Sequence, residues 1–450
     1  MKRVRSKNWL LILALTPLAA LAQVVDSTKS THHEFSIQQA VDYAKKNNVK
    51  VKNALLDVQI QEQTNREVTS AAYPQINASG SFTYNVKLPI SLIPAEIFGG
   101  TPGTFQKLPF GVKYNATGGI ELNQLLFDGQ VFVGLMARGT IIQFQQKKEE
   151  VTEEMIKANI YKIYYQLVVS KKQIELLDEN INRFEKLLHD TREIYKNGFA
   201  EQLDVDKVSV GLANLQTEKT KALNQIANGY LGLKILMGMP VKDELVLTDG
   251  LDEQGIKEGA LNAGSFNYTD RKEYQYADLG IKLNEYNVRR YKLSKIPTLS
   301  LNAYYNKNAQ RNKFDFFGGD WFSVSAVNLR LNIPIFNGFS TNAKIQKAQL
   351  TLQQSQNEKE ALELSIDNEV EVAKTNFQSA IVAMDYQKRN VELAAKVYDQ
   401  TKKKYEMGTG SQTEINTAQT DLKTAQTNYI TALYDAIIAR VDFLKATGKL

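Results

Sequence analysis

The chain has 450 residues, no cysteine, three histidines and a formal charge of +6. Without cysteine it has no disulfides, no thiolate nucleophile, no cysteine zinc site and no lipid anchor on an N-terminal cysteine. Two of the histidines, His32 and His33, adjoin each other in a polar stretch near the N-terminus, which argues against a histidine metal site or catalytic triad. No spacing of acids, histidines or hydroxyls stands out from the charged helix faces, so we expect no enzyme activity, no cofactor and no metal site.

Residues 1–22 have the parts of a secretory signal peptide. Basic residues at 2–7 precede an apolar run at 9–15, and Ala20-Leu21-Ala22 provides a small-x-small cleavage site. We predict cleavage after Ala22, with a retained membrane anchor as the alternative. Removal of the four basic residues of this segment lowers the formal charge from +6 to +2. That imbalance is too weak to indicate a nucleic-acid partner.

Short motifs recur along the chain at a nearly constant offset of 209 to 211 residues. Leu-Phe-Asp-Gly at 126–129 matches Ile-Phe-Asn-Gly at 335–338, Tyr-Lys-Asn-Gly at 195–198 matches Tyr-Glu-Met-Gly at 405–408, and Leu-Lys with a following glycine recurs at 233–238 and 444–448. Chance matches would not keep one spacing over such a distance. The pattern predicts two structural repeats, 23–240 and 267–450, joined by a glycine-rich, acidic linker or equatorial segment at 241–266.

Each repeat is predicted to contain two strands, because apolar residues change there from a helical period to alternation with polar residues. Pro74 and Pro297 open the first alternating segment of each repeat, and the predicted strands span about 74–86, 115–126, 297–306 and 321–335. Their polar faces carry asparagine, serine and threonine, which suits a wet lumen. A soluble, half-buried sheet is the alternative explanation of the alternation. Six aromatic residues suit a girdle at a membrane interface: Phe82, Tyr84, Tyr304, Tyr305, Trp321 and Phe322.

A long helical hairpin is predicted after each strand pair, at 131–238 and 340–447. The segment from Val131 to Asn197 contains no proline, and some 65 residues of helix extend for roughly 100 Å. Apolar residues recur in steps of three and four along the return helices, as in helices packed lengthwise in a coiled coil. The other flanks carry glutamine, asparagine, threonine and lysine, which suits helices wetted on both surfaces of a tube.

Four strands cannot close into a barrel, and every unpaired backbone group in hydrocarbon costs several kcal/mol. Three copies would supply twelve strands, within the even numbers known for transmembrane barrels. The predicted fold class is therefore an α+β membrane protein with a duplicated unit of helix, strand pair and long helical hairpin. In the predicted homotrimer a 12-stranded transmembrane β-barrel, four strands per chain, continues into an α-helical barrel.

This order of elements resembles the TolC family of outer-membrane efflux proteins across essentially the whole mature chain. The most specific stretch is Tyr-Glu-Met-Gly-Thr-Gly at 405–410 with the helix that follows, which is similar to the family's Y-x-x-G-T turn. The stretch 195–205 resembles the matching turn of the first repeat. The strand-to-helix junctions also fit the family, although Gln130 and Phe339 stand where many members have a second glycine; the matching residues are Asp128, Gly129, Asn337 and Gly338.

The resemblance implies a channel in outer-membrane lipid whose helical part crosses the periplasm. It also implies that the channel serves an inner-membrane pump through a periplasmic adaptor, or membrane fusion, protein. The helix-tip turns at Gly198 and Gly408 would form the periplasmic entrance. Glycine suits these turns because a helix reversal favours a left-handed residue.

Three side chains near the tips match entrance residues of the family. Asp204 and Glu414 match acids that constrict the entrance, and Tyr405 matches a tyrosine that helps to hold it shut. Gly410 and Thr417 replace an arginine and an aspartate of some members, so the closing network is expected to differ in detail. Three copies of each acid around a pore would attract cations, although acids also favour the first turn of a helix for ordinary reasons. We hypothesise a cation-preferring entrance.

The predicted function is the outer-membrane channel of a tripartite export system that conducts small molecules or ions from a pump and adaptor to the exterior. An exit duct for type I polypeptide secretion has the same fold and remains an alternative. An alternative of another class is a soluble periplasmic coiled-coil scaffold.

Overall fold

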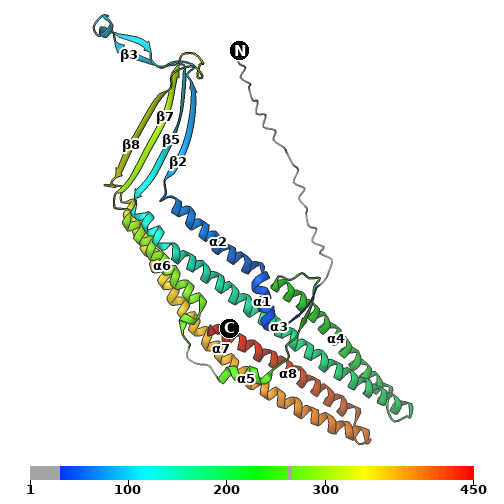
Figure 1. The fold of residues 1–450 in the computed structure, drawn as a ribbon. Helices are drawn as coiled ribbons and strands as arrows, with labels where there is room; N and C mark the ends of the chain where they lie inside the picture. The colour runs from blue at the N-terminus through cyan, green and yellow to red at the C-terminus, as the bar shows by residue number, and fades with distance from the viewer. Residues whose placement is uncertain (1–30, 262–265) are drawn as a thin grey trace, which may run out of the picture.

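A four-stranded sheet stands at one end of an elongated bundle of helices (Figure 1). The computed structural model describes residues 31–261 and 266–450. The predicted signal peptide, residues 1–22, lies outside this part of the chain. Over the described ranges, no helix combines the length and the apolar character needed to cross a membrane.

Each repeat contains, in the same order, a helix, two strands of the main sheet and a long helical hairpin, and a connecting segment lies between the repeats. The first repeat contains β1 (His32–Phe35), α1 (Ile37–Asn47), α2 (Val49–Ser70), β2 (Gln75–Tyr84), β3 (Ile90–Pro94), the 3-10 helix η1 (Ala95–Phe98), β4 (Phe105–Pro109), β5 (Tyr114–Phe127), α3 (Gly129–Lys196) and α4 (Gln202–Met237). The connecting segment contains β6 (Glu244–Leu247) and α5 (Glu253–Leu261). The second repeat contains the 3-10 helix η2 (Tyr268–Asp270), α6 (Lys272–Leu293), β7 (Thr298–Arg311), β8 (Phe322–Asn332), α7 (Ser340–Glu406) and α8 (Gln412–Ala446).

The main sheet has the order β2-β5-β7-β8, and all its neighbours are antiparallel. The two repeats meet in its middle, because β5 of the first repeat pairs with β7 of the second. Two smaller sheets complete the fold. β1 pairs in parallel with β6 beside the helices, and β3 pairs with β4 in a separate hairpin beyond the far end of the main sheet (Figure 1).

The long helices α3 and α7 have 68 and 67 residues, so each extends for roughly 100 Å. Each returns as a shorter antiparallel helix, α4 or α8, and α3 also contacts α2, α6 and α8. The core is therefore a lengthwise seam. Buried apolar residues form three clusters along it, around Leu167, Val208 and Leu433.

Polar side chains cap the first turns of α1 and α2. Ser36 and Gln39 form a reciprocal capping box at α1. Asn48 ends α1 and caps α2, since its Oδ1 accepts the backbone N–H groups of Lys50 (2.8 Å) and Val51 (3.3 Å). This cap divides the first helical segment into two helices.

The return helix of each repeat ends against the start of the short helix that leads to the strands. In the first repeat, Asn48 Nδ2 donates to the carbonyl oxygen of Leu236 at 2.6 Å. Gly238 follows with φ of +71°, and a Cβ there would collide with the carbonyl oxygen of Asn47. The equivalent contact in the second repeat uses Arg271, which donates to the carbonyl oxygen of Ala446 at 2.9 Å. The duplication seen in sequence thus extends to a duplicated tertiary contact.

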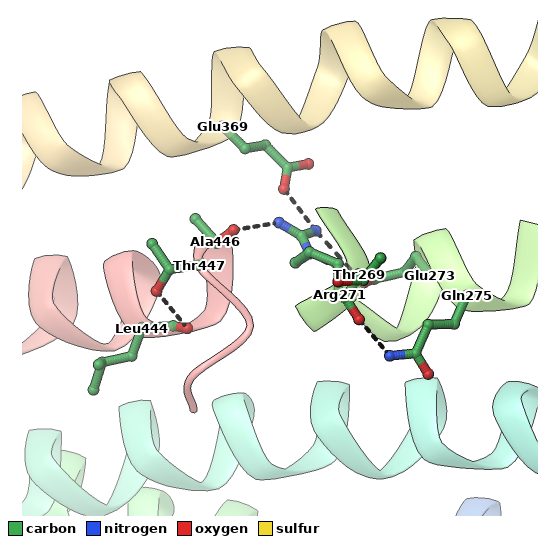
Figure 2. Close-up of polar contacts among 8 residues, drawn as sticks. All are labelled: Thr269, Arg271, Glu273, Gln275, Glu369, Leu444, Ala446 and Thr447. Carbon is green, nitrogen blue, oxygen red and sulfur yellow. Dashed lines mark hydrogen bonds and ion pairs between the residues drawn. The ribbon is translucent and has the colours of Figure 1, made fainter. Parts of the chain in front are cut away.

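Arg271 ties three helices together in the second repeat (Figure 2). Its side chain is 3% exposed. The guanidinium reaches Glu369 on α7 at 3.0 Å and Glu273 on α6 at 3.2 Å, besides Ala446 on α8. The backbone just after α8 approaches Asp270 so closely that position 448 requires glycine, because a Cβ there would lie 2.7 Å from the carbonyl oxygen of Asp270.

Two acids on α3, Glu149 and Glu153, lie near Lys45 of α1. Burial, and then the charge of Glu153, raise the pKa of Glu149 to about 7. Lys45 on α1 pairs with Glu153 at 3.1 Å and offsets part of this repulsion. Burial and the neighbouring carboxylate therefore disfavour the ionised form of Glu149.

Candidate functional site: a two-faced sheet and the helix tips

The main sheet has one apolar face. Its register sets Ile76 beside Leu122, Leu122 beside Ala303, and Ala303 beside Val327 across all four strands. Directly paired residues point to the same side of a sheet. Ile76 and Val327 are exposed nonetheless. A continuous exposed apolar face of this kind calls for an apolar environment.

The opposite face is polar and carries a hydrogen-bonded belt across three strands. Asn302 Nδ2 on β7 donates to Glu121 Oε1 (2.6 Å) and to Asn123 Oδ1 (2.7 Å) on β5. Asn123 Nδ2 donates to Glu121 Oε1 at 3.1 Å, and Asn328 Nδ2 on β8 donates to Asn302 Oδ1 at 3.5 Å. All of these contacts are exposed, so this face suits contact with water.

Aromatic rings gather at the end of the sheet that lies away from the helices. Tyr84 and Tyr114 stack with their centroids 5.0 Å apart. Phe316 and Phe314 of the β7–β8 loop lie edge-on to Phe82 (5.5 Å) and Tyr114 (5.9 Å) respectively. Rings grouped beside an apolar strand face are typical of a membrane interface.

Two of the six aromatic residues predicted for this girdle lie on the polar face instead. Tyr304 pairs with Glu121, and Phe322 pairs with Asn308. The prediction was wrong at these positions because it grouped aromatic residues without applying the strand period. Tyr304 and Tyr305 are consecutive, so only one of them can point to the apolar face.

The sheet has two free edges among the described residues. β2 pairs only with β5, and β8 pairs only with β7. The unpaired backbone groups along β2 and β8 are therefore available to other strands.

The predicted junction residues lie where the strands meet the helices. Pro74 immediately precedes β2, and Pro297 immediately precedes β7. At the first strand-to-helix junction, Asp128 caps α3 by accepting the N–H of Gln130 at 2.7 Å. Gly129 begins α3 so close to α6 that a Cβ would lie 2.9 Å from the Cβ of Leu293.

The second strand-to-helix junction has a different geometry. Gly338 and Phe339 both have positive φ, 60° and 64°, and α7 begins only after them. The side chain of Asn337 hydrogen-bonds Thr341. Within the described residues, Phe339 alone combines a side chain with a positive φ. It lies at the position where a glycine is common in the TolC family, which this sequence resembles.

Each long hairpin reverses through a left-handed glycine at the end far from the sheet (Figure 1). Gly198 has φ of +78° and Gly408 has φ of +74°. Their N–H groups donate to the carbonyl oxygens of Tyr195 (2.9 Å) and Tyr405 (3.0 Å). A Cβ at either glycine would meet nothing within 4 Å, so the backbone conformation alone calls for glycine.

The two acids predicted at the entrance lie in the first turns of the return helices, and each has a lysine nearby. Asp204 Oδ1 is 3.7 Å from Lys207 Nζ, and Glu414 Oε2 is 3.6 Å from Lys404 Nζ. The backbone N–H of Glu414 donates to Ser411 Oγ at 3.1 Å. Exposed pairs of this kind contribute at most about 1 kcal/mol, but they offset the negative charge locally.

Tyr405 lies half-buried, against the apolar cluster that joins the hairpins near their tips. In the described chain, no hydrogen bond or ion pair links Tyr405, Asp204 and Glu414 to one another. Sequence reasoning missed the two lysines. Lys207 follows Asp204 by three positions, a spacing that already predicts contact on a helix, whereas Lys404 meets Glu414 only because the hairpin folds back.

Polar residues are buried between the two hairpins, contrary to the expectation that such flanks are wetted. Gln412, Gln419 and Gln426 recur every seven residues on α8. Asn180 on α3 donates to Gln426 Oε1 at 2.8 Å, and Thr191 Oγ1 lies 3.4 Å from Gln412 Oε1. Gln419 is 0% exposed, and neither polar atom of its amide has a partner in the described chain. The prediction failed because heptad-spaced polar residues can also occupy a helix seam.

The chain is similar in sequence and in fold to known outer membrane proteins. Residues 271–449 match the family described as "Outer membrane efflux protein". The outer membrane efflux protein BepC of Brucella suis is 22% identical over 414 residues, which cover 90% of this chain and 84% of BepC. Among solved structures, CusC has a TM-score of 0.74 at 16% identity, with 93% of each chain covered. VceC of Vibrio cholerae has a TM-score of 0.72 at 14% identity, with 92% of this chain and 96% of VceC covered.

The fold is thus that of the outer-membrane channels in which a β-barrel continues into a helical barrel, and the predicted fold class is confirmed. Residues 271–449, which form the second repeat, match a family of outer membrane efflux proteins, and the chain is similar to one such protein over most of its length, in agreement with the resemblance predicted from the sequence. BepC is by its name an outer membrane efflux protein, which agrees with the location predicted for this chain from its sequence.

Proposed function

We propose that three copies of the chain close a 12-stranded barrel by pairing the free edge of β2 in one copy with the free edge of β8 in the next. The observation that carries this proposal is a sheet with one exposed apolar face, one exposed polar face and two open edges. In lipid such a sheet has to gain neighbours on both edges, because each unpaired backbone group costs several kcal/mol. Closure with the apolar face outward sets the belt of Glu121 and Asn302 around a water-filled interior.

The conduit continues below the barrel through the helical hairpins. Helices of roughly 100 Å are long enough to carry a passage from the outer membrane deep into the periplasm. At their tips the tube meets a periplasmic adaptor and an inner-membrane pump, which deliver small molecules or ions for export. An exit duct for a secreted polypeptide would use the same scaffold, and the identity of the pump distinguishes the two.

The entrance of the channel lies at the helix tips. Asp204 and Glu414 line it, and the half-buried Tyr405 helps to hold it shut. Threefold symmetry repeats each carboxylate three times around the axis, which favours cations. Lys207 and Lys404 offset this charge, so the preference for cations is modest. In planar bilayers, the double variant Asp204→Asn/Glu414→Gln shifts the reversal potential in a salt gradient toward that of a non-selective channel. Unchanged selectivity would reject the acidic ring and leave the channel itself in place.

The channel assignment is tested by extraction and co-purification. The protein is expected to need detergent and to migrate as a heat-sensitive trimer. Cross-linking in intact cells before extraction is expected to recover the adaptor and the pump. A pump for drugs or metals supports the efflux duct, a peptide-exporting pump supports polypeptide secretion, and a detergent-independent monomer contradicts both.

A further inference from the structure

An open groove with a volume of about 620 Å³ lies between α2 and α3. The two helices pack side by side and lead away from the main sheet (Figure 1). The groove starts at Tyr73, in the link between α2 and β2. Its lining also includes Glu62, Arg66, Arg138 and Gly139. It therefore begins where the sheet ends and extends along the helices.

Hydrogen bonds between the two helices hold the groove in shape. The buried Asn65 on α2 donates to the carbonyl oxygen of Arg138 on α3 at 3.1 Å. Arg138 Nη1 donates to Thr69 Oγ1 on α2 at 3.0 Å, and its Nε donates to the carbonyl oxygen of Leu135 at 3.0 Å. Among the described residues these bonds use two of the five N–H donors of the guanidinium, and the others can bind a ligand.

The charged side chains of the groove have no partner of opposite charge within residues 31–261 and 266–450. Arg66 reaches only an amide oxygen of its own helix, at 3.5 Å. The arginines that pair with carboxylates in those ranges are two others, neither of which lines the groove. Glu62 precedes Arg66 by one helical turn, and no ion pair joins the two in the described chain. The groove therefore presents two cations and one carboxylate, which a zwitterionic ligand can pair.

The groove opens on the side of the apolar sheet face. Phe127, at the end of β5, pairs with Leu299, which shares the apolar face with Ala303 four residues later. The ring centroids of Phe127 and Phe132 lie 5.6 Å apart, so this side of α3 continues the apolar face. Gly139 follows Phe132 by seven residues, almost two helical turns, and lies on the same side. Because the apolar face is the outer face of the proposed barrel, the groove faces outward as well.

In the proposed barrel the groove lies at the level of the lipid headgroups. Ile76, an exposed apolar residue at the start of β2, follows Tyr73 by three positions. Arg66 is seven residues before Tyr73, about 10 Å further from the sheet. Headgroups occupy roughly 5 to 8 Å on each side of the hydrocarbon core, and the long side chain of arginine extends toward them. The two cations are thus within reach of the phosphates of the periplasmic leaflet.

The next copy of the chain leaves this groove open. The helices follow the order of the strands, since α3 packs between α2 and α6. The far side of α2 therefore lies below the free edge of β2, where the proposed trimer sets the next copy. Asn65 points toward α3, and Leu56, nine residues earlier, is exposed on that far side. The groove opens between these two sides, so its position favours a phospholipid over a neighbouring chain as the ligand.

We propose that this groove binds one phospholipid of the phosphatidylethanolamine class from the periplasmic leaflet. Arg66 and Arg138 hold the phosphate, because guanidinium groups bind phosphate oxygens through paired, charge-assisted hydrogen bonds. Glu62 accepts the ammonium group, and the acyl chains lie along the apolar face beside Ile76. The inference rests on the outward apolar face of the proposed function. One bound lipid per chain sets the height of the barrel in the membrane.

Native mass spectrometry measures the lipid that the detergent-extracted trimer retains from micelles with equal amounts of phosphatidylethanolamine, phosphatidylglycerol and phosphatidylcholine. The unmodified protein is expected to prefer phosphatidylethanolamine, because glycerol has no positive charge for Glu62 and choline has no N–H to donate. Arg66→Gln/Arg138→Gln is expected to retain at least about tenfold less, since one hydrogen bond to a charged group typically contributes that factor. The matched control, Arg289→Gln/Arg290→Gln, removes the same charge near the sheet end of α6, outside the groove.

A second pair of variants changes the shape of the groove and keeps its charge. A Cβ at Gly139 or at Gly134 meets nothing within 4 Å, so both positions of α3 accept a side chain. Gly139→Leu fills the groove and is expected to lower retention as the arginine variant does. Gly134→Leu lies on another side of α3, about 140° away, and is expected to retain lipid like the unmodified protein. Both replacements raise helix propensity, so the trimer is expected to persist.

A third variant tests the ammonium contact. Glu62→Gln is expected to keep lipid in the groove through the two arginines but to lose the preference for phosphatidylethanolamine over phosphatidylglycerol. An unchanged preference in this variant would refute the role of Glu62.

The other outcomes separate the lipid site from the channel. Equal retention by the unmodified protein, Arg66→Gln/Arg138→Gln and Gly139→Leu, with the heat-sensitive trimer intact, would refute the site and leave the proposed channel in place. Displacement of the retained lipid by millimolar inorganic phosphate would mean that the groove recognises a free anion, and would also refute the proposal. Absence of the heat-sensitive trimer from the unmodified protein would instead refute the proposed function.

Discussion

Replacing Arg271 with methionine is expected to lower the free energy of unfolding by about 3 kcal/mol. The guanidinium is 3% exposed and donates to three acceptors, on α6, α7 and the end of α8. Loss of one partner from a buried ion pair typically costs about 3 to 5 kcal/mol. Glu369 is half exposed and Glu273 is partly exposed, so both carboxylates regain water and the cost falls at the lower end. The carbonyl oxygen of Ala446 is left without its donor, at about 1 to 3 kcal/mol within that total.

The measurement is urea unfolding of the purified protein in detergent, followed by circular dichroism at the helix band. Arg271→Lys is the first control, because lysine keeps the charge but cannot span three acceptors in fixed directions. It is expected to lose less stability than Arg271→Met. Asn48→Ala tests the equivalent neutral contact of the first repeat and is expected to cost about 1 to 2 kcal/mol. A loss below about 0.5 kcal/mol for Arg271→Met, the range of an ordinary surface substitution, would refute the assignment of Arg271 as the tie between these helices.

Three further predictions use matched positions. Gly408→Ala is expected to cost about 1 to 2 kcal/mol from its left-handed backbone alone, whereas Gly238→Ala adds a collision with backbone and is expected to cost clearly more; equal urea midpoints would contradict this. Burial and the charge of Glu153 raise the pKa of Glu149 from 4.5 to about 7, so the stability of the folded chain is highest below pH 4.5 and falls as pH rises toward 7. The whole shift corresponds to about 3 kcal/mol, and screening by solvent at this partly exposed side chain reduces the expected effect to about 1 kcal/mol. Glu149→Gln should therefore be more stable than the parent by about 1 kcal/mol at pH 8 and equal to it at pH 4, and a difference that is constant with pH would argue against this assignment. Leu329→Lys on the apolar face of β8 is expected to destabilise the barrel in the membrane by about 2 to 4 kcal/mol. Asn328→Lys on the polar face is expected to form the trimer normally, and gels that detect the heat-sensitive trimer compare the two variants.

The periodic parts of the fold were accessible from sequence because burial imposes a period. Alternation between Ile76 and Tyr84 predicted a strand whose observed bounds are Gln75–Tyr84, and the proline-free run from Val131 predicted the helix observed as Gly129–Lys196. The connecting segment 241–266 was predicted as a linker or equatorial segment, and its short elements β6 and α5 were not predicted. β6 has only four residues and pairs with β1, more than 200 residues earlier in the chain, and so short a strand carries almost no period of its own.

Less of the candidate site was predictable, because its contacts depend on packing between distant elements. The glycines at the tips were predicted from the repeated Tyr-x-x-Gly motif and the family resemblance, and the preference for a left-handed residue just past a helix end supports them. The ion pair of Glu414 with Lys404 and the buried Gln419 depend on how helices face each other, which spacing alone leaves open. Gln412, Gln419 and Gln426 do carry a heptad spacing, but composition favoured a solvated flank for them.

The buried glutamines give the two hairpins of one chain a different kind of contact from the one within each hairpin. Within the second hairpin, α7 and α8 bury apolar residues such as Phe377 and Leu433. Between the hairpins, α8 meets α3 through amides as well as apolar groups, and the amide of Gln419 has no hydrogen-bond partner within residues 31–261 and 266–450. An unpaired buried amide is costly, and it regains water when the helices separate. Separation of α8 from α3 therefore recovers part of its own cost by restoring water to Gln419, whereas separation of α7 from α8 exposes apolar residues such as Phe377 and Leu433 without such a gain.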